Sequence, residues 1–278
     1  MIIAVNSFTL NDPTSTTPVF LDEPIAGLSM PPIRTSSGTY SGRDGGYVGS
    51  QFYGMRLITL TGAIFGAPAL LESTRLAFEA AVSTGSVLLT ITTNAGNQYV
   101  LNCYLDSLDI PMVRSTSKAP FNLTLIAPDP TIYDNSAGGL QTVGITPVGG
   151  GGVTWPIAWT PVIWAPGTLA QTVINNGNVV IYPKITLTGA ATNPTITNTT
   201  TGQFFTIQGL TTSAGDVIVI DMLNRTVLLN GGYILTYVLL TSSWWALLAG
   251  SNSITLTTNN SADTVTGVIS WRSGYRGI

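Results

Sequence analysis

The sequence predicts a mainly β protein with one α-helix in its N-terminal part and a β-sandwich or jelly roll at its C-terminal end. Gly and Pro, the residues typical of turns, number 30 and 16 among 278 residues. Only one segment has helical periodicity, and short β-rich runs separated by turn signals fill the C-terminal part. The length exceeds the ~100 to 200 residues of a usual domain, which favours two domains.

The helix is predicted at about residues 67–83. Pro68 suits a first helical turn, and a glycine follows the segment as a stop signal. Arg75 stands three residues after Glu72 and four before Glu79, the spacings at which helical side chains pair. The apolar residues gather on one side, so this helix should cover one face of a sheet.

Strands are predicted on both sides of the helix. They are residues 1–10, 56–64, 86–93, 98–105 and 121–126, with a turn at 94–97 joining the third and fourth. The first ten residues lack the charged start and the ~7 to 15 apolar residues of a secretory signal, so we expect a strand there. The Gly-rich run Ser41–Ser50 is interpreted as a loop, although its amides could also cradle an anion.

The C-terminal part predicts roughly eight short strands in about 105 residues, which is typical of a sandwich or jelly roll. They are residues 179–187, 194–198, 203–207, 216–221, 226–229, 233–240, 252–258 and 264–271. Before them, residues 136–172 are rich in Gly and Pro but contain Trp155, Trp159 and Trp164, too apolar for a free linker. The predicted organisation is therefore a domain at 1–135, a connector at 136–172 that packs onto something, and a domain at 173–278.

The absence of histidine excludes most catalytic designs. Without imidazole there is no Ser-His or Cys-His pair and no HExxH metal site. Cys103 is the only cysteine, and its alternation with Leu101 and Leu105 indicates a core position. We therefore expect no catalytic residue, no metal and no cofactor.

The charge pattern excludes two partner classes. A net charge of -3 and a pI near 4.7, with no basic run, argue against direct nucleic-acid recognition. Residues 233–250 are uncharged but contain Thr and Ser, so no membrane span is expected. Charged residues make up 8% of the chain, against about 25% in average proteins, which suits a surface buried against neighbours.

Two sets of residues leave alternatives open. The carboxylate pairs Asp106/Asp109 and Asp216/Asp221 could serve glycoside hydrolysis on facing walls of a cleft, but turns and strand ends are the favoured interpretation. Trp244 and Trp245 could contact a sugar. Consecutive residues of a strand point to opposite faces, however, so core packing of at least one tryptophan is favoured.

A series of C-terminal motifs resembles one known family. In order, they are Asn175-Asn-Gly177, Tyr182-Pro-Lys-Ile-Thr-Leu-Thr-Gly189, Asn193-Pro-Thr-Ile-Thr-Asn198, Thr200-Thr-Gly202, Gly215-Asp-x-Ile-x-Ile-Asp221, Asn230-Gly231, Ser243-Trp-Trp, Gly250-x-Asn252 and Trp271-Arg272-x-x-Tyr275. As a set, they resemble the C-terminal galectin-like domain of siphophage distal tail proteins, over nearly all of residues 173–278.

The N-terminal part is similar to the ring-forming domain of the same family. It has a Gly-rich loop, a strand that contains Arg56, one helix, a hairpin and a closing Asp-Pro-x-x-Tyr motif. The residues that the resemblance marks as structural are Arg56, Asp129, Pro130, Tyr133, Pro183, Asn198, Gly202, Gly215, Asp216, Asp221, Trp244, Trp245, Gly250, Asn252 and Trp271.

The resemblance implies a structural hub in a virion. Such a protein forms a homohexameric ring at the distal end of a long non-contractile tail, after synthesis in the bacterial host cytoplasm. The implied partners are further copies of itself, the tail tube protein, a tail-tip hub or tail-associated lysin-like protein, and receptor-binding proteins. The alternative is a carbohydrate-binding β-sandwich for cell-surface attachment, using Trp244, Trp245 or the connector tryptophans. An enzyme ranks third.

Overall fold

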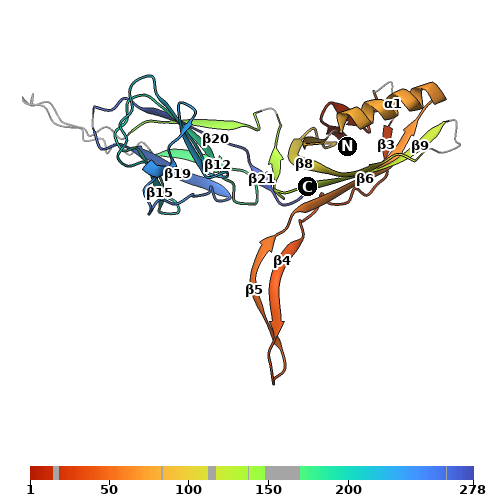
Figure 1. The fold of residues 1–278 in the computed structure, drawn as a ribbon, viewed down its shortest axis with the longest axis horizontal. Helices are drawn as coiled ribbons and strands as arrows, with labels where there is room; N and C mark the ends of the chain where they lie inside the picture. Colours follow the sequence, from red (N-terminus) through yellow and green to blue (C-terminus); the bar gives the residue numbers. More distant parts are fainter. Residues whose placement is uncertain (15–18, 83, 112–116, 137, 148–169, 261) are drawn as a thin grey trace, which may run out of the picture. The chain divides into compact units, whose positions relative to one another are not determined.

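The computed structural model describes residues 1–14, 19–82, 84–111, 117–136, 138–147, 170–260 and 262–278. It divides into two compact units. The first comprises Met1–Gly138 with Tyr275–Ile278, and the second comprises Gly139–Gly274. The predicted mainly β class is confirmed, and the described residues contain one α-helix (Figure 1).

The first unit is built on one antiparallel sheet with the strand order β2-β1-β7-β8-β9-β6-β3. The bounds are β1 (Ile2–Val5), β2 (Phe8–Leu10), β3 (Val19–Leu21), β6 (Arg56–Phe65), β7 (Ser86–Thr92), β8 (Gln98–Asp109) and β9 (Lys118–Ala127). β10 (Ile132–Asp134) pairs with β8 and with β21 (Gly274–Tyr275). The Asn11 amide donates to the Val19 carbonyl at 2.7 Å, which brings β2 close to β3. The sheet therefore curls around an interior.

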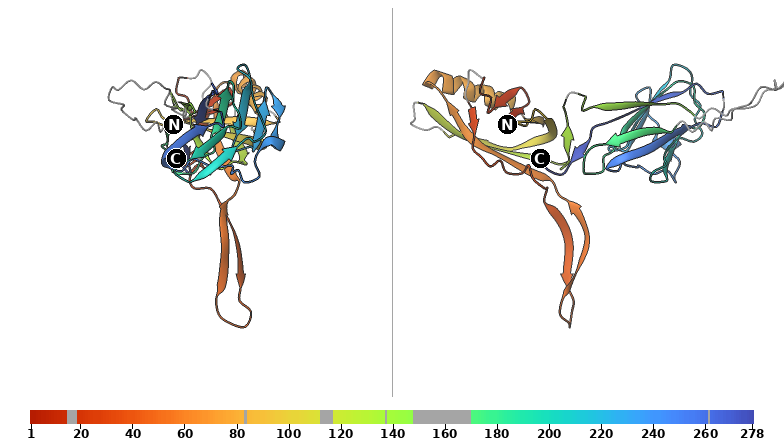
Figure 2. Two further views of the ribbon diagram at one scale, coloured as in Figure 1. Left: turned by 90° about the vertical axis from the view of Figure 1, so that its left-hand side faces the viewer. Right: turned by 180° about the vertical axis from the view of Figure 1, so that it is seen from behind.

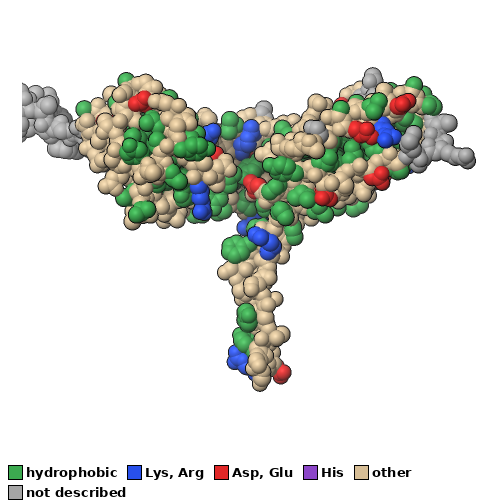
Figure 3. Space-filling model, in the orientation of Figure 1, with side chains coloured by type: hydrophobic (Ala, Val, Ile, Leu, Met, Phe, Trp, Pro, Cys, Tyr) green, Lys and Arg blue, Asp and Glu red, His purple; other side chains and the backbone are tan. Residues whose placement is uncertain are grey.

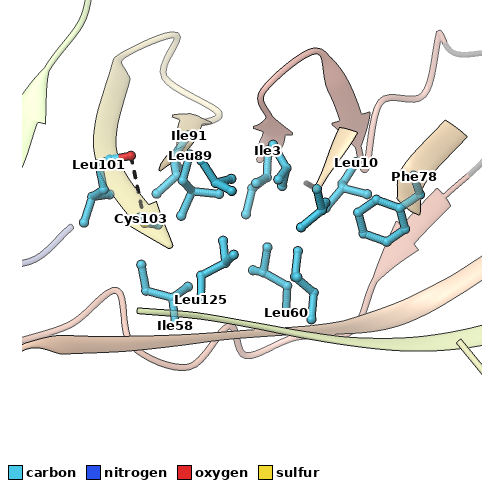
Figure 4. Packing of buried hydrophobic residues seen from close by; sticks show 14 of the residues in the cluster. Ile3, Leu10, Ile58, Leu60, Phe78, Leu89, Ile91, Leu101, Cys103 and Leu125 are labelled. Carbon is cyan, nitrogen blue, oxygen red and sulfur yellow. Dashed lines mark hydrogen bonds between the residues drawn. The ribbon is translucent and has the colours of Figure 1, made fainter. Parts of the chain in front are cut away.

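Alternate side chains of these strands fill that interior, because successive residues of a strand point to opposite faces. Figure 4 shows Leu89, Leu101 and Cys103 on one arc of the sheet pointing toward Ile58 and Leu125 on the other. All five are buried. The core position predicted for the cysteine is therefore confirmed.

The helix α1 (Pro68–Ala81) covers one part of this core. Phe78 is fully buried, stacks on Phe8 with ring centroids 4.6 Å apart, and meets Phe121 edge-on at 5.2 Å. The helix begins and ends within about two residues of the predicted bounds, and residue 83 lies outside the described residues. Among the described helices, none has the length and apolar character needed to cross a membrane.

A separate two-stranded hairpin projects from the first unit (Figures 1 and 2). It consists of β4 (Ile33–Thr39) and β5 (Gly46–Tyr53), and we call these residues with their connecting turn the arm. Neither strand contains a buried residue. The interpretation of Ser41–Ser50 as a loop is wrong in its second half, because residues from Gly46 onward pair with β4.

The second unit consists of two antiparallel sheets. One has the order β11-β20-β13-β16-β17-β18 and the other β12-β19-β14-β15. The bounds are β11 (Gln141–Ile145), β12 (Gln171–Asn175), β13 (Lys184–Thr188), β14 (Thr195–Asn198), β15 (Gln203–Thr206), β16 (Val217–Asp221), β17 (Thr226–Leu229), β18 (Gly232–Tyr233), β19 (Gly250–Thr257) and β20 (Thr266–Trp271). The alternating residues of both sheets are buried, which gives the unit its core.

Two segments of this unit differ from the sequence predictions. The strand predicted at 233–240 ends after Tyr233 and is followed by a short 3₁₀ helix, Leu235–Tyr237. Within the predicted connector at 136–172, β11 and the start of β12 belong to the sheets of this unit. The three connector tryptophans, within residues 148–169, lie outside the described residues, so the packing of this segment stays a prediction.

Candidate functional site

Arg56 is the centre of a buried polar junction in the first unit. Its side chain is 1% exposed, and its guanidinium donates only to backbone carbonyls. Nε and Nη2 donate to Pro130 at 3.1 and 2.9 Å, Nη1 donates to Gly27 at 2.5 Å and to Ser29, and Nη2 donates to Arg276 at 2.6 Å. Burial lowers the pKa of Arg56 from its ordinary value.

The closing motif lies beside this guanidinium. The Tyr133 hydroxyl donates to the Asp129 carboxylate at 2.7 Å, and the Thr131 amide donates to the same carboxylate at 3.0 Å. Burial, with the nearby carboxylate of Asp129, raises the pKa of Tyr133 above its ordinary value. The structure thus brings together four residues of the family motifs, Arg56, Asp129, Pro130 and Tyr133. Their hydrogen bonds hold together the loops around the guanidinium.

A second polar cluster joins Asn198 and Asn252 in the other unit. Both side chains are completely buried. Asn252 exchanges two hydrogen bonds with the Leu248 backbone at 2.9 Å, and Asn198 donates to the carbonyl of Ala246 at 3.3 Å. These bonds fix the segment that follows the two tryptophans, and Gly250, with φ +89°, begins the next strand there.

The two adjacent tryptophans have different environments. Trp245 is 1% exposed and belongs to the core. Trp244 is half-buried and packs on Phe205 with ring centroids 4.7 Å apart. The proposed sugar contact of Trp245 is therefore wrong for this structure, because a buried ring offers no face for stacking.

The carboxylates of the second unit cap turns. Asp216 accepts from the amide of Ser213 at 2.7 Å and from Asn230 at 2.8 Å, and the first of these bonds is the larger cause of its lowered pKa. Asp221 accepts from the Asn224 amide at 2.9 Å, at the other end of β16. The two carboxylates therefore serve separate turns, and a shared cleft is not formed. Within the described parts of the chain, no three His, Cys, Asp or Glu side chains gather to hold a metal ion.

The remaining motif residues occupy turns and edges of the same unit. Gly202, with φ +71°, lies between β14 and β15, and Gly215 lies in the turn before β16. The Pro183 carbonyl accepts from the Met222 amide at 3.2 Å. Trp271 is 5% exposed, and its Nε1 donates to the carbonyl of Ile174 at 3.0 Å.

The arm also carries exposed apolar side chains, and its two strands were not predicted from the sequence. Val48, Phe52 and Tyr47 are 66%, 63% and 52% exposed, and Ile33 is 49% exposed. Figure 3 shows apolar side chains along the arm and basic side chains near both of its ends. Such a concentration of apolar surface on a thin projection marks an interaction site.

Comparison with known proteins shows a family match for part of the chain and a similar fold for all of it. Residues 176–275 match the family of siphovirus-type tail components, C-terminal domain. No curated protein sequence matches the chain. The Dit protein of phage SPP1, described as a paradigm of the hub adsorption apparatus in phages that infect Gram-positive bacteria, has a similar fold at 15% identity and a TM-score of 0.67, over 97% of each chain.

Two structures of the phage P2 baseplate in its activated conformation also share the fold. The calcium form gives a TM-score of 0.52 at 10% identity, over 100% of this chain and 99% of that chain. The strontium form gives 0.51 at 10% identity, over 100% and 98%. The resemblance to siphophage distal tail proteins is therefore confirmed, in sequence for the C-terminal domain and in fold for the whole chain.

Proposed function

We propose that this protein is a structural hub of the tail of a long-tailed, non-contractile phage. In the proposal, copies of the chain form a homohexameric ring at the distal end of the tail tube. The ring connects the tube to tail-tip or baseplate proteins that act in host adhesion. The family match and the fold shared with a hub protein and a baseplate protein support this role. It is a structural role that needs no catalytic residue.

The observation that carries self-assembly is the arm. A two-stranded hairpin alone is marginally stable in water, and three or more strands or a packed face are needed for independent stability. The arm has no packed face, since none of its strand residues is buried. Its apolar side chains would be covered if a neighbouring chain lay against them.

Light scattering of the purified full-length chain over a range of concentrations tests this proposal. We expect a mass six times that of the 29.1 kDa chain, or smaller species that convert to it as concentration rises. The double variant Val48→Ser, Phe52→Ser should remain monomeric at concentrations at which the wild type assembles. Leu76→Ser is the matched control, because Leu76 is 59% exposed on α1 in the same unit.

Two results would count against this proposal, the first against the ring and the second against the arm as its interface. One is a wild-type chain that stays monomeric both alone and when mixed with its tail tube protein. The other is assembly that persists unchanged in the double variant, which would remove the arm from the interface. A glycan array with the wild type would then test the carbohydrate-binding alternative.

A further inference from the structure

The outer face of the curled sheet in the first unit carries an exposed apolar row. The register places Leu57 on β6 opposite Ile126 on β9, and Ile126 opposite Tyr104 on β8. Side chains directly opposite on neighbouring strands lie on one face. Leu57 is 54% exposed and Tyr104 is 50% exposed, whereas the flanking Ile58 and Cys103 are buried. The row therefore faces away from the core.

Acidic side chains flank this row. A register shift between Leu105 and Ser107 leaves Asp106 as the extra residue of β8, two positions from Tyr104. Asp106 and Asp109 are both exposed. Of the strands that form this face, β8 contains no Lys or Arg, Arg56 of β6 is buried, and Lys118 of β9 lies at the far end of that strand, opposite Phe65. This face thus combines a tyrosine ring and aliphatic side chains with a negative rim.

The arm presents the complementary features. Arg34 and Phe52 are register partners, so both lie on one face of the hairpin. With Thr35, Ser36 and Ser50 they line an open hollow of about 520 Å³. A hollow with an arginine and an aromatic wall suits a second aromatic ring and a carboxylate beside it. Arg34 is exposed, and no ion pair to it is found among the described residues.

The geometry of the arm favours docking on a second copy of the protein rather than on the sheet of its own chain. Only Gly54 and Met55 separate β5 from β6, and the Gly54 amide donates to Pro32 at 2.7 Å, which closes the base of the hairpin. A connection this short gives the arm little freedom to fold back. Figures 1 and 2 show the arm projecting away from the sheet that carries the apolar row.

We propose that the arm of one copy docks on the outer face of β6, β9 and β8 of a second copy. Tyr104 of the receiving copy occupies the hollow beside Phe52, and Asp106 pairs with Arg34. The inference rests on the self-assembly proposed above and names the receiving surface. Because each copy has one arm and one receiving face at different places, the contact is heterologous, the type that generates rings when the rotation closes.

Charge reversal in both partners is the first test. Arg34→Glu and Asp106→Arg should each raise the concentration at half-assembly at least tenfold, because each places like charges together. The combined variant should recover assembly to within about threefold of the wild type, since the pair is restored with opposite polarity. Glu72→Arg, on the exposed side of α1, is the control and should assemble as the wild type does. Additive losses in the combined variant would overturn the pairing.

Cross-linking then tests the receiving face independently of ring assembly. Full-length Ser50→Cys and Ser107→Cys, with different affinity tags, would be mixed and treated with a short bismaleimide. We expect a covalent dimer that carries both tags, whereas each variant alone should give none above background. Assembly seen by light scattering without this product would overturn the receiving face but leave the ring intact. A cross-link within a doubly substituted single chain would show that the arm folds on its own sheet, and would overturn the inference too.

Discussion

At the scale of single residues, the adjacent tryptophans illustrate how position in a strand-like segment decides a role. Trp245 is enclosed by the sandwich core, and its Nε1 has no hydrogen-bond partner among the described residues. Its contribution is therefore apolar volume. Trp244, half-buried against Phe205, contributes one aromatic contact at the margin.

Replacement of each tryptophan should separate these roles. Trp245→Ala should lower the free energy of unfolding of the second unit by about 3–5 kcal/mol, the cost of truncating a buried large side chain. Trp245→Phe should cost less, because no hydrogen bond is lost. Trp244→Ala should cost less than Trp245→Ala, since it loses an aromatic pair worth about 1 kcal/mol and only the apolar area that a half-buried ring covers. Urea denaturation followed by fluorescence measures all three, and equal losses at the two positions would contradict this assignment.

The burial of Cys103 predicts how the reactivity of its thiol and its effect on stability depend on pH. Burial raises the pKa of its thiol to about 12, although the nearby Arg56 guanidinium acts weakly in the opposite direction. At pH 8.5 the folded chain should hold on the order of a thousandfold less thiolate than the unfolded chain, whose thiol has a pKa near 8.5. Because the unfolded thiol ionises first, this group should reduce stability as pH rises above about 9.

Iodoacetamide labelling at pH 8.5 measures this difference. The native chain should resist the reagent, and the chain in guanidinium chloride should react rapidly. Rapid labelling under native conditions would show that the core around Cys103 opens. The same inertness keeps the native cysteine silent in the cross-linking experiment described above.

At the scale of elements, the sequence predicts the helices and strands that bury one face against a core. It misses the two arm strands, which bury neither face. The helix and the hairpin of β7 and β8 have strong periodicity, because their apolar residues alternate with exposed ones against a core. The arm has no such signal, since both of its faces are exposed and its Gly residues resemble a loop. Three apolar side chains within residues 47–52 were the only available indication.

The opposite error occurs after β18. The apolar run at 233–240 predicts a strand, yet Leu240 is fully exposed and Leu235–Tyr237 turns as a 3₁₀ helix. Apolar composition indicates burial only when a partner surface exists within the chain. The motif residues Arg56 and Asn198 show the limit at the site, because their carbonyl partners at Arg276 and Ala246 stand far from them in sequence. Residue spacing alone does not reveal such partners.

The arm should be dispensable for folding. Replacing residues 33–53 by a short Gly-Ser turn should leave the free energy of unfolding of the first unit within about 1 kcal/mol of the wild type, because no arm residue belongs to the core. The shortened chain should lose assembly. Circular dichroism with light scattering measures both properties, and an unfolded product would show that the arm instead supports the sheet.

At the scale of the whole molecule, the chain returns to its first unit after building the second. The Ile278 amide donates to Leu28 at 3.1 Å, and the ring of Tyr275 meets that of Tyr99 edge-on at 5.5 Å. Arg56 donates to the carbonyl of Arg276. Four C-terminal residues therefore complete a unit whose other members precede residue 139.

Because the last four residues belong to the first unit, their removal should destabilise that unit and not the second. A chain ending at Gly274 loses the charge-assisted hydrogen bond from Arg56 to Arg276, worth about 1.5–3 kcal/mol, the bond from Ile278 to Leu28, worth about 1 kcal/mol, and one aromatic pair. The first unit should therefore lose about 3–5 kcal/mol, and the second should be unchanged. All six tryptophans lie within the range of the second unit, and the single cysteine lies in the first. Tryptophan fluorescence and thiol labelling during denaturation consequently report on different units.

The expected result is a labelling transition at lower denaturant with an unmoved fluorescence transition. Arg56→Lys in the full chain should give the same pattern, because one ammonium cannot reach the four separated carbonyls that the guanidinium binds. Arg75→Lys on the helix, where Arg75 forms only an exposed pair with Glu79 at 2.8 Å, is the matched control and should change neither transition. If the truncation moved both transitions together, the two units would unfold as one cooperative body, and the C-terminal return would stabilise the whole chain.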